Sequence, residues 1–307
     1  MINHYTSHGL VWIDAVSPTT EEISGLVKRY DLHPLVGEEL KSSTSLAKID
    51  FYKEYILVVL TIPVRVRNGD RYDIVDREVD FVIGKNFLIT TRFDSIEQLE
   101  YFSKVFEANS ILNKEEKMEH AGHLFYYMIK RIYSGMCEDL ENIKDSLIGA
   151  ETSIFDGSER KMVEVLSDLS RELIDFKQTA RIHQEIWDDM TSYQDMTLFG
   201  KDFGAYTRDI RAEFNKIREI IGNTRELLAD LRETNDSLLN ARQNEIIKML
   251  TLVSFIFNPL IFIASIFTIP ALSVPIIGTS SGWWILMVLM IALSGGIWYL
   301  FKKKEWI

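Results

Sequence analysis

The sequence contains little cysteine, proline or basic charge. Cys137 is the only cysteine among 307 residues, so no disulfide can form within the chain. Only 6 prolines are present, and none lies between Pro63 and Pro259, a composition that permits very long helices. Lys and Arg number 34 against 45 Asp and Glu, which excludes the basic surface that nucleic-acid binders usually carry. We therefore expect no nucleic-acid partner.

The most informative absence is a long stretch without any charge. From Met249 to Phe301 the chain contains no Asp, Glu, Lys or Arg. Because a core helix of a soluble protein rarely exceeds about 20 residues, this stretch excludes a soluble globular enzyme. The four charges after Lys248 sum to +2 and the whole chain carries −11, so residues 1–248 carry −13. The sequence predicts an acidic soluble domain followed by a C-terminal membrane anchor.

The uncharged stretch divides into two apolar runs, over about residues 246–267 and 283–301. Each is close to the roughly 20 residues that cross a bilayer. The linking segment, 268–282, is rich in Pro, Gly and Ser. Lys248 precedes the first run and the lysines at 302–304 follow the second, so the positive-inside tendency places both termini in the cytoplasm. We expect no secretory signal before the soluble part, and a two-pass protein of the cell inner membrane.

The acidic part combines strand-like and helix-like patterns. Strands are predicted at 9–16, 55–66 and 76–93, and helices at 33–41, 95–112, 116–150, 159–190 and about 205–267. The Asn68-Gly69 pair between alternating apolar residues predicts a hairpin. The last helix would be about 95 Å long at 1.5 Å per residue. A helix of that length needs neighbouring helices or other subunits to be stable.

These elements predict an α/β cytoplasmic domain followed by long stalk helices and a C-terminal two-helix transmembrane hairpin. The expected parts are a cytoplasmic α/β domain (1–112), antiparallel cytoplasmic helices (113–204), a stalk helix that continues as the first span (205–268), an outer loop (269–282), the second span (283–301) and a basic cytoplasmic tail (302–307).

Polar residues of the first span fall on one side of the predicted helix. Two lanes with a seven-residue repeat carry them, one with Asn244, Thr251, Asn258 and Ser265, the other with Ile247, Ser254, Ile261 and Thr268. Polar groups at mid-membrane must face water or protein, because lipid cannot satisfy them. The pattern favours a pore lined by one copy of this helix from each subunit. Ordinary interhelical packing of small polar residues is the alternative.

Acidic residues continue these lanes into the soluble part. The series comprises Glu219, Glu226, Asp230 and Glu233. Around a central axis such acids would form stacked rings that attract cations. A parallel series, Arg211, Arg218, Arg225 and Arg232, has the same seven-residue interval. Either series could face the axis, and an exposed coiled-coil surface with alternating charge is a further interpretation.

Other reactive residue types are few. His120 and His123 lie three apart beside Glu119 on a predicted helix, a spacing that can ligate zinc or nickel, but solvated imidazoles are the simpler interpretation. Cys137 is expected to pack between helices. No nucleotide loop, metal-protease motif or nucleophile elbow occurs, so we expect no enzymatic activity, no catalytic residue and no tightly bound cofactor.

The segment NEIIKMLTLVSFIFNPLIFIASIF (244–267), the short loop, the second span and the terminal FKKKEWI resemble the CorA magnesium-channel family. DLHPLVGEEL (31–40) and VDFVIGKNFLITTR (79–92) also look like its soluble domain. The resemblance covers essentially the whole chain. It implies a homopentameric funnel with stalk helices and a central pore, embedded in lipid and passing metal ions.

Carried over by position, the resemblance implies a set of pore-lining residues: Asn244, Ile247, Leu250, Thr251, Ser254, Asn258, Ile261 and Ser265, with Thr268 at the outer end. Ile247 and Leu250 would form an apolar constriction that gates by dewetting. Asp209 falls where the family places a carboxylate of an intersubunit magnesium-sensing site, which implies a regulatory Mg²⁺. The family's acidic pore rings favour Glu226 and Glu233 facing the axis.

One position departs from the family pattern. The family ends its first span with Gly-Met-Asn, whose Asn binds hydrated magnesium at the outer mouth, and this chain has Thr268-Ile269-Pro270 there. Proline offers neither a side-chain acceptor nor an amide donor. Asn258 stands where a hydrophobic residue is usual. These differences imply a CorA-like pore with altered selectivity.

Three functions are compatible with the sequence. The first is a CorA-like channel or transporter for divalent metal cations such as Mg²⁺, Co²⁺, Ni²⁺ or Zn²⁺. The second is a CorA-like pore for monovalent cations, anions or weakly selective flux, which the uncharged segment 268–282 favours. The third is a non-conducting membrane sensor, which the polar residues along the span argue against.

Overall fold

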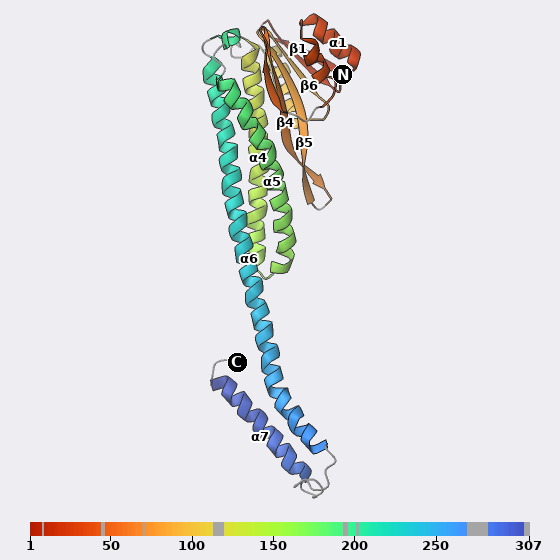
Figure 1. Cartoon of the computed structure of the whole chain (residues 1–307). Helices are drawn as coiled ribbons and strands as arrows, with labels where there is room; N and C mark the ends of the chain where they lie inside the picture. Colours follow the sequence, from red (N-terminus) through yellow and green to blue (C-terminus); the bar gives the residue numbers. More distant parts are fainter. Residues whose placement is uncertain are drawn as a thin grey trace. The chain divides into compact units, whose positions relative to one another are not determined.

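The structure is a computed structural model that describes residues 1–7, 9–43, 47–69, 71–112, 120–192, 196–200, 203–268 and 282–303 (Figure 1). The elements are β1 (Ile2–Ser7), β2 (Leu10–Val16), α1 (Thr20–Arg29), α2 (Pro34–Glu39), β3 (Lys48–Phe51), β4 (Tyr55–Asn68), β5 (Arg71–Gly84), β6 (Phe87–Arg92), α3 (Glu97–Leu112), α4 (Ala121–Phe155), α5 (Glu159–Ser192), η1 (Met196–Phe199), α6 (Phe203–Thr268) and α7 (Gly282–Lys303).

The chain divides into two compact units, Met1–Glu233 and Thr234–Ile307. The division falls inside α6, so the first part of this helix belongs to the first unit and the remainder to the second. The strands and the helices α1 to α5 all lie in the first unit, whereas the described residues of the second unit form the end of α6 and the whole of α7.

The first unit is built on a six-stranded sheet with the order β1-β2-β6-β5-β4-β3. The pair β2 and β6 is parallel, and all other neighbours are antiparallel. The long β4–β5 hairpin pairs Tyr55 with Gly84 and Asn68 with Arg71. At its turn Gly69 has φ of +64°, a conformation that glycine adopts without steric cost. The predicted hairpin is therefore confirmed; Asp70 lies outside the described residues.

Helices cover both faces of this sheet. One face forms an apolar core with α1 and α2, in which Ile13, Val59 and Val82 of the strands pack with Ile23 and Val36 of the helices. The chain enters α1 through a capping box in which the Thr19 side chain and the Glu22 side chain exchange hydrogen bonds with backbone amides, an arrangement that satisfies two N–H groups at the helix start.

The other face packs against α3 and α4. The Trp12 ring on β2 makes edge contacts with Phe102 and Phe106 of α3, at centroid distances of 5.7 and 5.8 Å. Phe81 of β5 contacts Phe125 of α4 edge to face at 5.2 Å. These apolar contacts fix the long helices onto the sheet.

In the first unit α4, α5 and the beginning of α6 run side by side (Figure 1). The packed side of α6 has alternating three- and four-residue spacing: Ile210, Phe214, Ile217, Ile221, Thr224, Leu228 and Leu231 are all buried. This spacing is that of a helix packed along its length by a coiled-coil-like seam. Neighbouring helices thus support the long helix, as the sequence predicts.

Two strands and part of one helix differ from the sequence prediction. β1 (Ile2–Ser7) and β3 (Lys48–Phe51), which form the two edges of the sheet, were not expected. The helix predicted to end near residue 150 continues to Phe155 and stops before Gly157, whose φ is +96°. Residues 116–119 of that predicted helix lie outside the described residues.

Candidate ion pathway on helix α6

In the second unit α6 and α7 pack against each other as an antiparallel pair. The half-buried residues at this end of α6 are Leu252, Ile256, Pro259, Leu260 and Ile263. On α7 the half-buried residues recur at the same helical spacing, including Met290, Ser294 and Phe301. Phe255 and Phe301 meet edge to face with ring centroids 6.1 Å apart. One side of α6 is therefore occupied by α7.

The polar stripe lies on the opposite side of α6. At about 100° per residue, the lane of Thr251, Asn258 and Ser265 is centred roughly 145° from the half-buried residues that face α7. All three of these stripe residues are exposed, and so are Asn244 and Ser254. The packing between α6 and α7 thus leaves the stripe uncovered in a single chain.

The stripe hydroxyls donate to the backbone of their own helix. Thr251 donates to the carbonyl of Ile247 at 2.7 Å, and Ser254 to that of Leu250 at 2.9 Å. Ser265 and Thr268 make corresponding bonds of 2.8 Å. Each hydroxyl has a single hydrogen, so only oxygen lone pairs remain for a partner outside the helix. The hydroxyls of the stripe therefore act outward as acceptors, which attract cations and the hydrogens of water.

Asn258 differs from the hydroxyl residues because its amide has no hydrogen-bond partner among the residues that the structure describes. The next residue, Pro259, lies inside the helix and has no amide hydrogen to donate to the carbonyl of Phe255. The middle of the span therefore has a side-chain amide without a partner, that of Asn258, next to Pro259, where the helix lacks one backbone hydrogen bond. Both are costly in lipid and require water or protein.

A groove of about 670 Å³ runs along the stripe and extends to Pro259 and to Phe255, whose ring contacts Phe301 of α7. It is lined by Ile247, Leu250, Thr251, Ser254, Phe255, Asn258, Pro259 and Phe262. At its lower-numbered end the apolar side chains of Ile247 and Leu250 are 51% and 62% exposed. The groove thus combines an apolar end with a polar middle on one continuous face.

The acidic series of α6 lies away from the other helices of the first unit. Glu219, Glu226, Asp230 and Glu233 are all exposed. At about 100° per residue they are centred roughly opposite the buried seam of Phe214 and Ile221. In a single chain, these carboxylates therefore lie on the side of α6 that is turned away from the other helices of the first unit.

The arginine series borders the packed side instead. Arg211 forms an ion pair of 2.8 Å with Asp188 of α5. Arg232 donates to the carbonyl of Leu166, also on α5, at 3.4 Å. Arg211 and Arg232 therefore face α5, whereas all four acids of the series are exposed.

Asp209 is paired within its own chain. Its Oδ2 atom accepts a hydrogen bond from the Tyr126 hydroxyl and lies 3.2 Å from the ammonium of Lys130, both on α4. The Tyr126 hydrogen bond, followed by that of Lys130, lowers the pKa of Asp209. The same contacts raise the pKa of Lys130, so both groups are charged at neutral pH. Sequence reasoning missed these partners, because nothing in the pattern links residues about 80 positions apart.

The histidine pair lies at the start of α4. The His120 and His123 rings are 4.0 Å apart, and His120 also contacts the rings of Phe199 and Phe203. His120 is buried, so the expectation of a solvated imidazole is wrong at this position. Burial, and then the neighbouring His123, lowers the pKa of His120 to about 4. Within the described ranges no group of three His, Cys, Asp or Glu side chains is placed to hold a metal ion.

Two residues of the outer mouth, Ile269 and Pro270, lie outside the described residues, as do Glu119 and the segment 271–281. Thr268 is the last described residue of α6 and is exposed. Cys137 is half-buried and its thiol pKa is raised by burial, as suits a packing residue.

Both helices of the second unit are long and apolar enough to cross a membrane by length and composition. They follow an acidic α/β unit through one continuous helix, and the first of them has an exposed stripe of polar side chains along a groove. This combination of fold and site defines a membrane protein for ion transport.

Comparisons with known proteins agree. The chain is 24% identical to the cobalt/magnesium transport protein CorA of Thermotoga maritima, over 96% of this chain and 85% of that protein. It is similar in structure to the complete CorA magnesium transporter of Methanocaldococcus jannaschii, with a TM-score of 0.83, 20% identity, and coverage of 99% and 93% of the two chains. The full-length CmaX protein is a further neighbour, with a TM-score of 0.71, 16% identity, and coverage of 97% and 89%.

Residues 7–303 match the family of CorA-like Mg²⁺ transporter proteins, and the chain belongs to this family. Its function is that of a CorA-like divalent-cation transporter or channel. The family consists of homo-oligomeric inner-membrane proteins with two C-terminal apolar helices that move metal ions and are not enzymes. The sequence-based assignment of the family, the fold class and the transport function is therefore confirmed.

Proposed function

We propose that five copies of this chain surround one pore, and that the polar stripe of α6 lines it. The observation that carries this proposal is the position of the stripe, which is exposed and opposite the side of α6 that packs on α7. A single helix cannot enclose water, and lipid cannot satisfy the Asn258 amide. Further copies of α6 around a central axis would cover every stripe at once and enclose an aqueous path.

The permeant ion is a cation in this proposal. The hydroxyls of Thr251, Ser254 and Ser265 donate to their own helix and offer only acceptor oxygens to the pore. The acids at Glu219, Glu226, Asp230 and Glu233 are on the free face of α6. Repeated around an axis, both features attract cations and repel anions.

Selectivity among divalent cations would depend on Asn258. Its amide oxygen is an uncharged acceptor near the middle of the span, suited to a hydrated Mg²⁺, Co²⁺, Ni²⁺ or Zn²⁺ ion because Mg²⁺ in particular retains several of its waters. Thr268, Ile269 and Pro270 offer one hydroxyl, one apolar side chain and one proline at the outer mouth. We therefore place the main polar ring inside the membrane rather than at its surface.

The apolar end of the groove would be the gate. Ile247 and Leu250 are exposed on the stripe side of α6, and five copies of each would form a constriction that excludes water when narrow. Asn244, close to them along the chain, would provide a polar ring on the other side of this constriction. Both chain termini would lie in the cytoplasm, in accordance with the lysines that flank the two spans.

Asp209 is the candidate for a regulatory divalent ion, such as Mg²⁺, bound between subunits. In one chain its carboxylate already contacts Lys130 and Tyr126. An ion at this position would therefore have to displace the Lys130 ammonium and recruit acids from a neighbouring copy.

The test is ion flux into liposomes that contain the purified protein. Mg²⁺, Co²⁺, Ni²⁺, Zn²⁺, K⁺ and Cl⁻ are compared for the unmodified protein, for Asn258→Leu in the stripe, and for Ile256→Leu as the matched control on the α7-facing side. We expect divalent flux that falls at least tenfold in Asn258→Leu and is retained in Ile256→Leu. Flux of K⁺ or Cl⁻ without divalent flux would contradict the proposed ion, and silence for every ion would favour a membrane sensor.

A further inference from the structure

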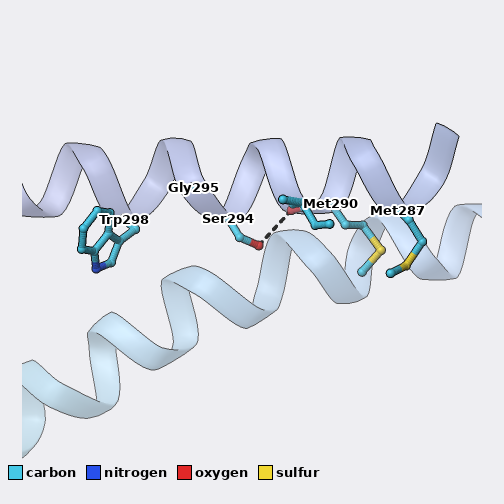
Figure 2. Close-up of a pocket in the computed structure, with 6 residues that line it drawn as sticks. Met287, Met290, Ser294, Gly295 and Trp298 are labelled. Carbon is cyan, nitrogen blue, oxygen red and sulfur yellow. Dashed lines mark hydrogen bonds between the residues drawn. The ribbon is translucent and has the colours of Figure 1, made fainter. Parts of the chain in front are cut away.

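A polar cavity in the first unit takes no part in the proposed ion pathway. It has a volume of about 660 Å³ and lies between the β4–β5 hairpin, α3 and α4. Its chemistry contrasts with that of the groove on α7, where apolar side chains such as Met287, Met290 and Trp298 form a surface typical of a membrane-spanning helix (Figure 2). Charged walls favour a polar occupant, because charged groups are costly to remove from water without a partner.

Three cationic side chains line this cavity, each from a different element. Arg67 belongs to β4, Arg77 to β5 and Lys104 to α3. Within the described ranges, none of the three forms an ion pair with a carboxylate. Arginine and lysine side chains that converge without acidic partners are the groups that proteins use to bind phosphate.

Backbone carbonyls position the two arginines. The Nε atom of Arg67 donates to the carbonyl of Gly69 at 3.1 Å, and Nη1 of Arg77 donates to the carbonyl of Ser95. A guanidinium group has five N–H hydrogens, so each arginine retains donors for a further partner. The fork geometry of these donors matches two oxygens of one phosphate group.

Two other charged groups that line the cavity are already paired. Arg65 forms an ion pair of 2.8 Å with Glu172 of α5. The Glu100 carboxylate accepts hydrogen bonds from the Ser95 hydroxyl and from Arg92, and these contacts lower its pKa. Neither group therefore neutralises the three cations.

Two further carboxylates provide acceptors at the cavity. The Oδ2 atom of Asp139 accepts the backbone N–H of Arg65 at 3.4 Å, and burial raises the pKa of this carboxyl. Glu97 is exposed in the first turn of α3. In the described residues no group of three His, Cys, Asp or Glu side chains is placed to hold a metal ion. Carboxylates also accept hydrogen bonds from the sugar hydroxyls of nucleotides, and this is the use that fits here.

Tyr101 of α3 gives the cavity an aromatic wall. The Arg131 guanidinium lies over its ring, 4.7 Å from the centroid, and Tyr101 is nevertheless 53% exposed. Arg131 thus covers one face of the ring and leaves the other accessible. Nucleotide bases stack on exposed aromatic faces of this kind.

We propose that this cavity binds a nucleoside di- or triphosphate. Arg67, Arg77 and Lys104 hold the phosphates, and Tyr101 stacks on the base. The volume of about 660 Å³ lies within the range of about 300–1,000 Å³ for small-molecule sites and exceeds what an inorganic phosphate ion fills. The site is separate from the ion pathway and goes beyond the proposed transport function.

The test is isothermal titration calorimetry of the full-length protein in detergent with ATP, tripolyphosphate or adenosine. Divalent ions are left out, so that binding to the ion pathway does not contribute. We expect ATP to bind at least tenfold more tightly than either fragment. The double substitution Arg77→Gln and Lys104→Gln should weaken ATP binding at least tenfold. Arg71→Gln is the matched control, because Arg71 lies on the same strand but pairs with Glu164 and Asp168 of α5, and it should bind ATP like the unmodified protein.

A second variant separates the base from the phosphates. Tyr101→Leu should weaken ATP binding about tenfold, the effect of losing one stacked base, and leave tripolyphosphate binding unchanged. It also keeps the proposal testable if the double variant does not fold. Absence of ATP binding by the unmodified protein would overturn the proposal. So would equal weakening by Arg71→Gln and the double variant, because that result would indicate general attraction between the protein and a polyanion. Unchanged ATP binding in Tyr101→Leu would show that the site does not recognise a nucleotide.

Discussion

The ammonium of Lys130 lies 3.2 Å from the Oδ2 atom of Asp209. The lysine therefore occupies the position that a divalent ion would take on this carboxylate. Both side chains are over two-fifths exposed, so the pair contributes little to stability. Under the proposed regulation, a metal ion would have to compete with Lys130 for this oxygen.

Removing this competitor is expected to strengthen divalent binding at Asp209. In Lys130→Met, the Mg²⁺ concentration that half-protects the purified protein from limited proteolysis should fall several-fold, and in Asp209→Asn protection should be lost. Lys144→Met, an exposed lysine on the same helix, is the control and should behave as the unmodified protein. If Lys130→Met and Asp209→Asn both leave the Mg²⁺ dependence unchanged, Asp209 does not bind a regulatory ion.

The exposed acids of α6 are expected to concentrate cations at the pore. Replacing Glu219, Glu226 and Glu233 with Gln together should lower divalent flux about three- to tenfold at low ionic strength. At 1 M salt the Debye length is only about 3 Å, so the effect should largely disappear. Glu213→Gln removes an acid that is paired with Lys216 and is the control. Equal or greater flux in the triple variant would show that these acids do not face the ion path.

The pH dependence of stability is expected to reflect His183. Its Nε2 atom is 2.7 Å from the Thr61 carbonyl, which can only accept, so Nε2 carries the hydrogen and Nδ1 accepts from the Tyr133 hydroxyl at 3.0 Å. The Trp187 indole donates to the same hydroxyl. Complete burial lowers the pKa of His183 to about 4, because a proton on Nδ1 would add an unsolvated charge and break this chain of hydrogen bonds.

The direction in which stability changes with pH follows from the number of protons that the folded and unfolded chains bind. Between pH 6.5 and pH 4 the unfolded chain binds a proton at His183 and the folded chain does not, so stability falls as pH falls through this window. The shift from 6.5 to about 4 corresponds to about 3 kcal/mol. In detergent at pH 7.5, His183→Gln should unfold at a lower temperature than the unmodified protein. Between pH 6.5 and pH 4.5, however, its unfolding temperature should change less than that of the unmodified protein. An unaltered pH slope, equal to that of the exposed-site control His4→Gln, would contradict this account.

The sequence predicted the long hairpin and the long helices because the residue patterns that indicate them extend over many positions. The Asn68-Gly69 turn specified the β4–β5 hairpin, and the absence of proline between Pro63 and Pro259 allowed the long helix α6. The edge strand β1 was missed because its residues, Ile2–Ser7, are mostly polar. What places it in the sheet is tertiary contact, such as the stacking of Tyr5 on Trp12 at 4.6 Å.

The site was predicted less completely. The seven-residue repeat located the polar stripe around Asn258, but it could not decide between the acidic and arginine series, because both have the same period. Burial in the single chain supports the acidic series: Phe214 is on the packed side of α6, Arg211 pairs with Asp188 beside it, and Glu226 is exposed on the other side. The partners of Asp209 were not predictable, since they depend on how α4 and α6 are aligned.

The measurement that tests the central claim most directly is thiol block of ion flux. In a Cys137→Ser background, Ser254→Cys places a thiol on the polar stripe and Ile256→Cys places one on the side that packs against α7. Each variant is reconstituted in liposomes, and flux of the most permeant divalent ion is recorded before and after a cationic methanethiosulfonate reagent. The account predicts that the reagent blocks flux in Ser254→Cys and leaves it unchanged in Ile256→Cys. Block in Ile256→Cys alone, or unchanged flux in a fully labelled Ser254→Cys, would contradict a pore lined by the stripe.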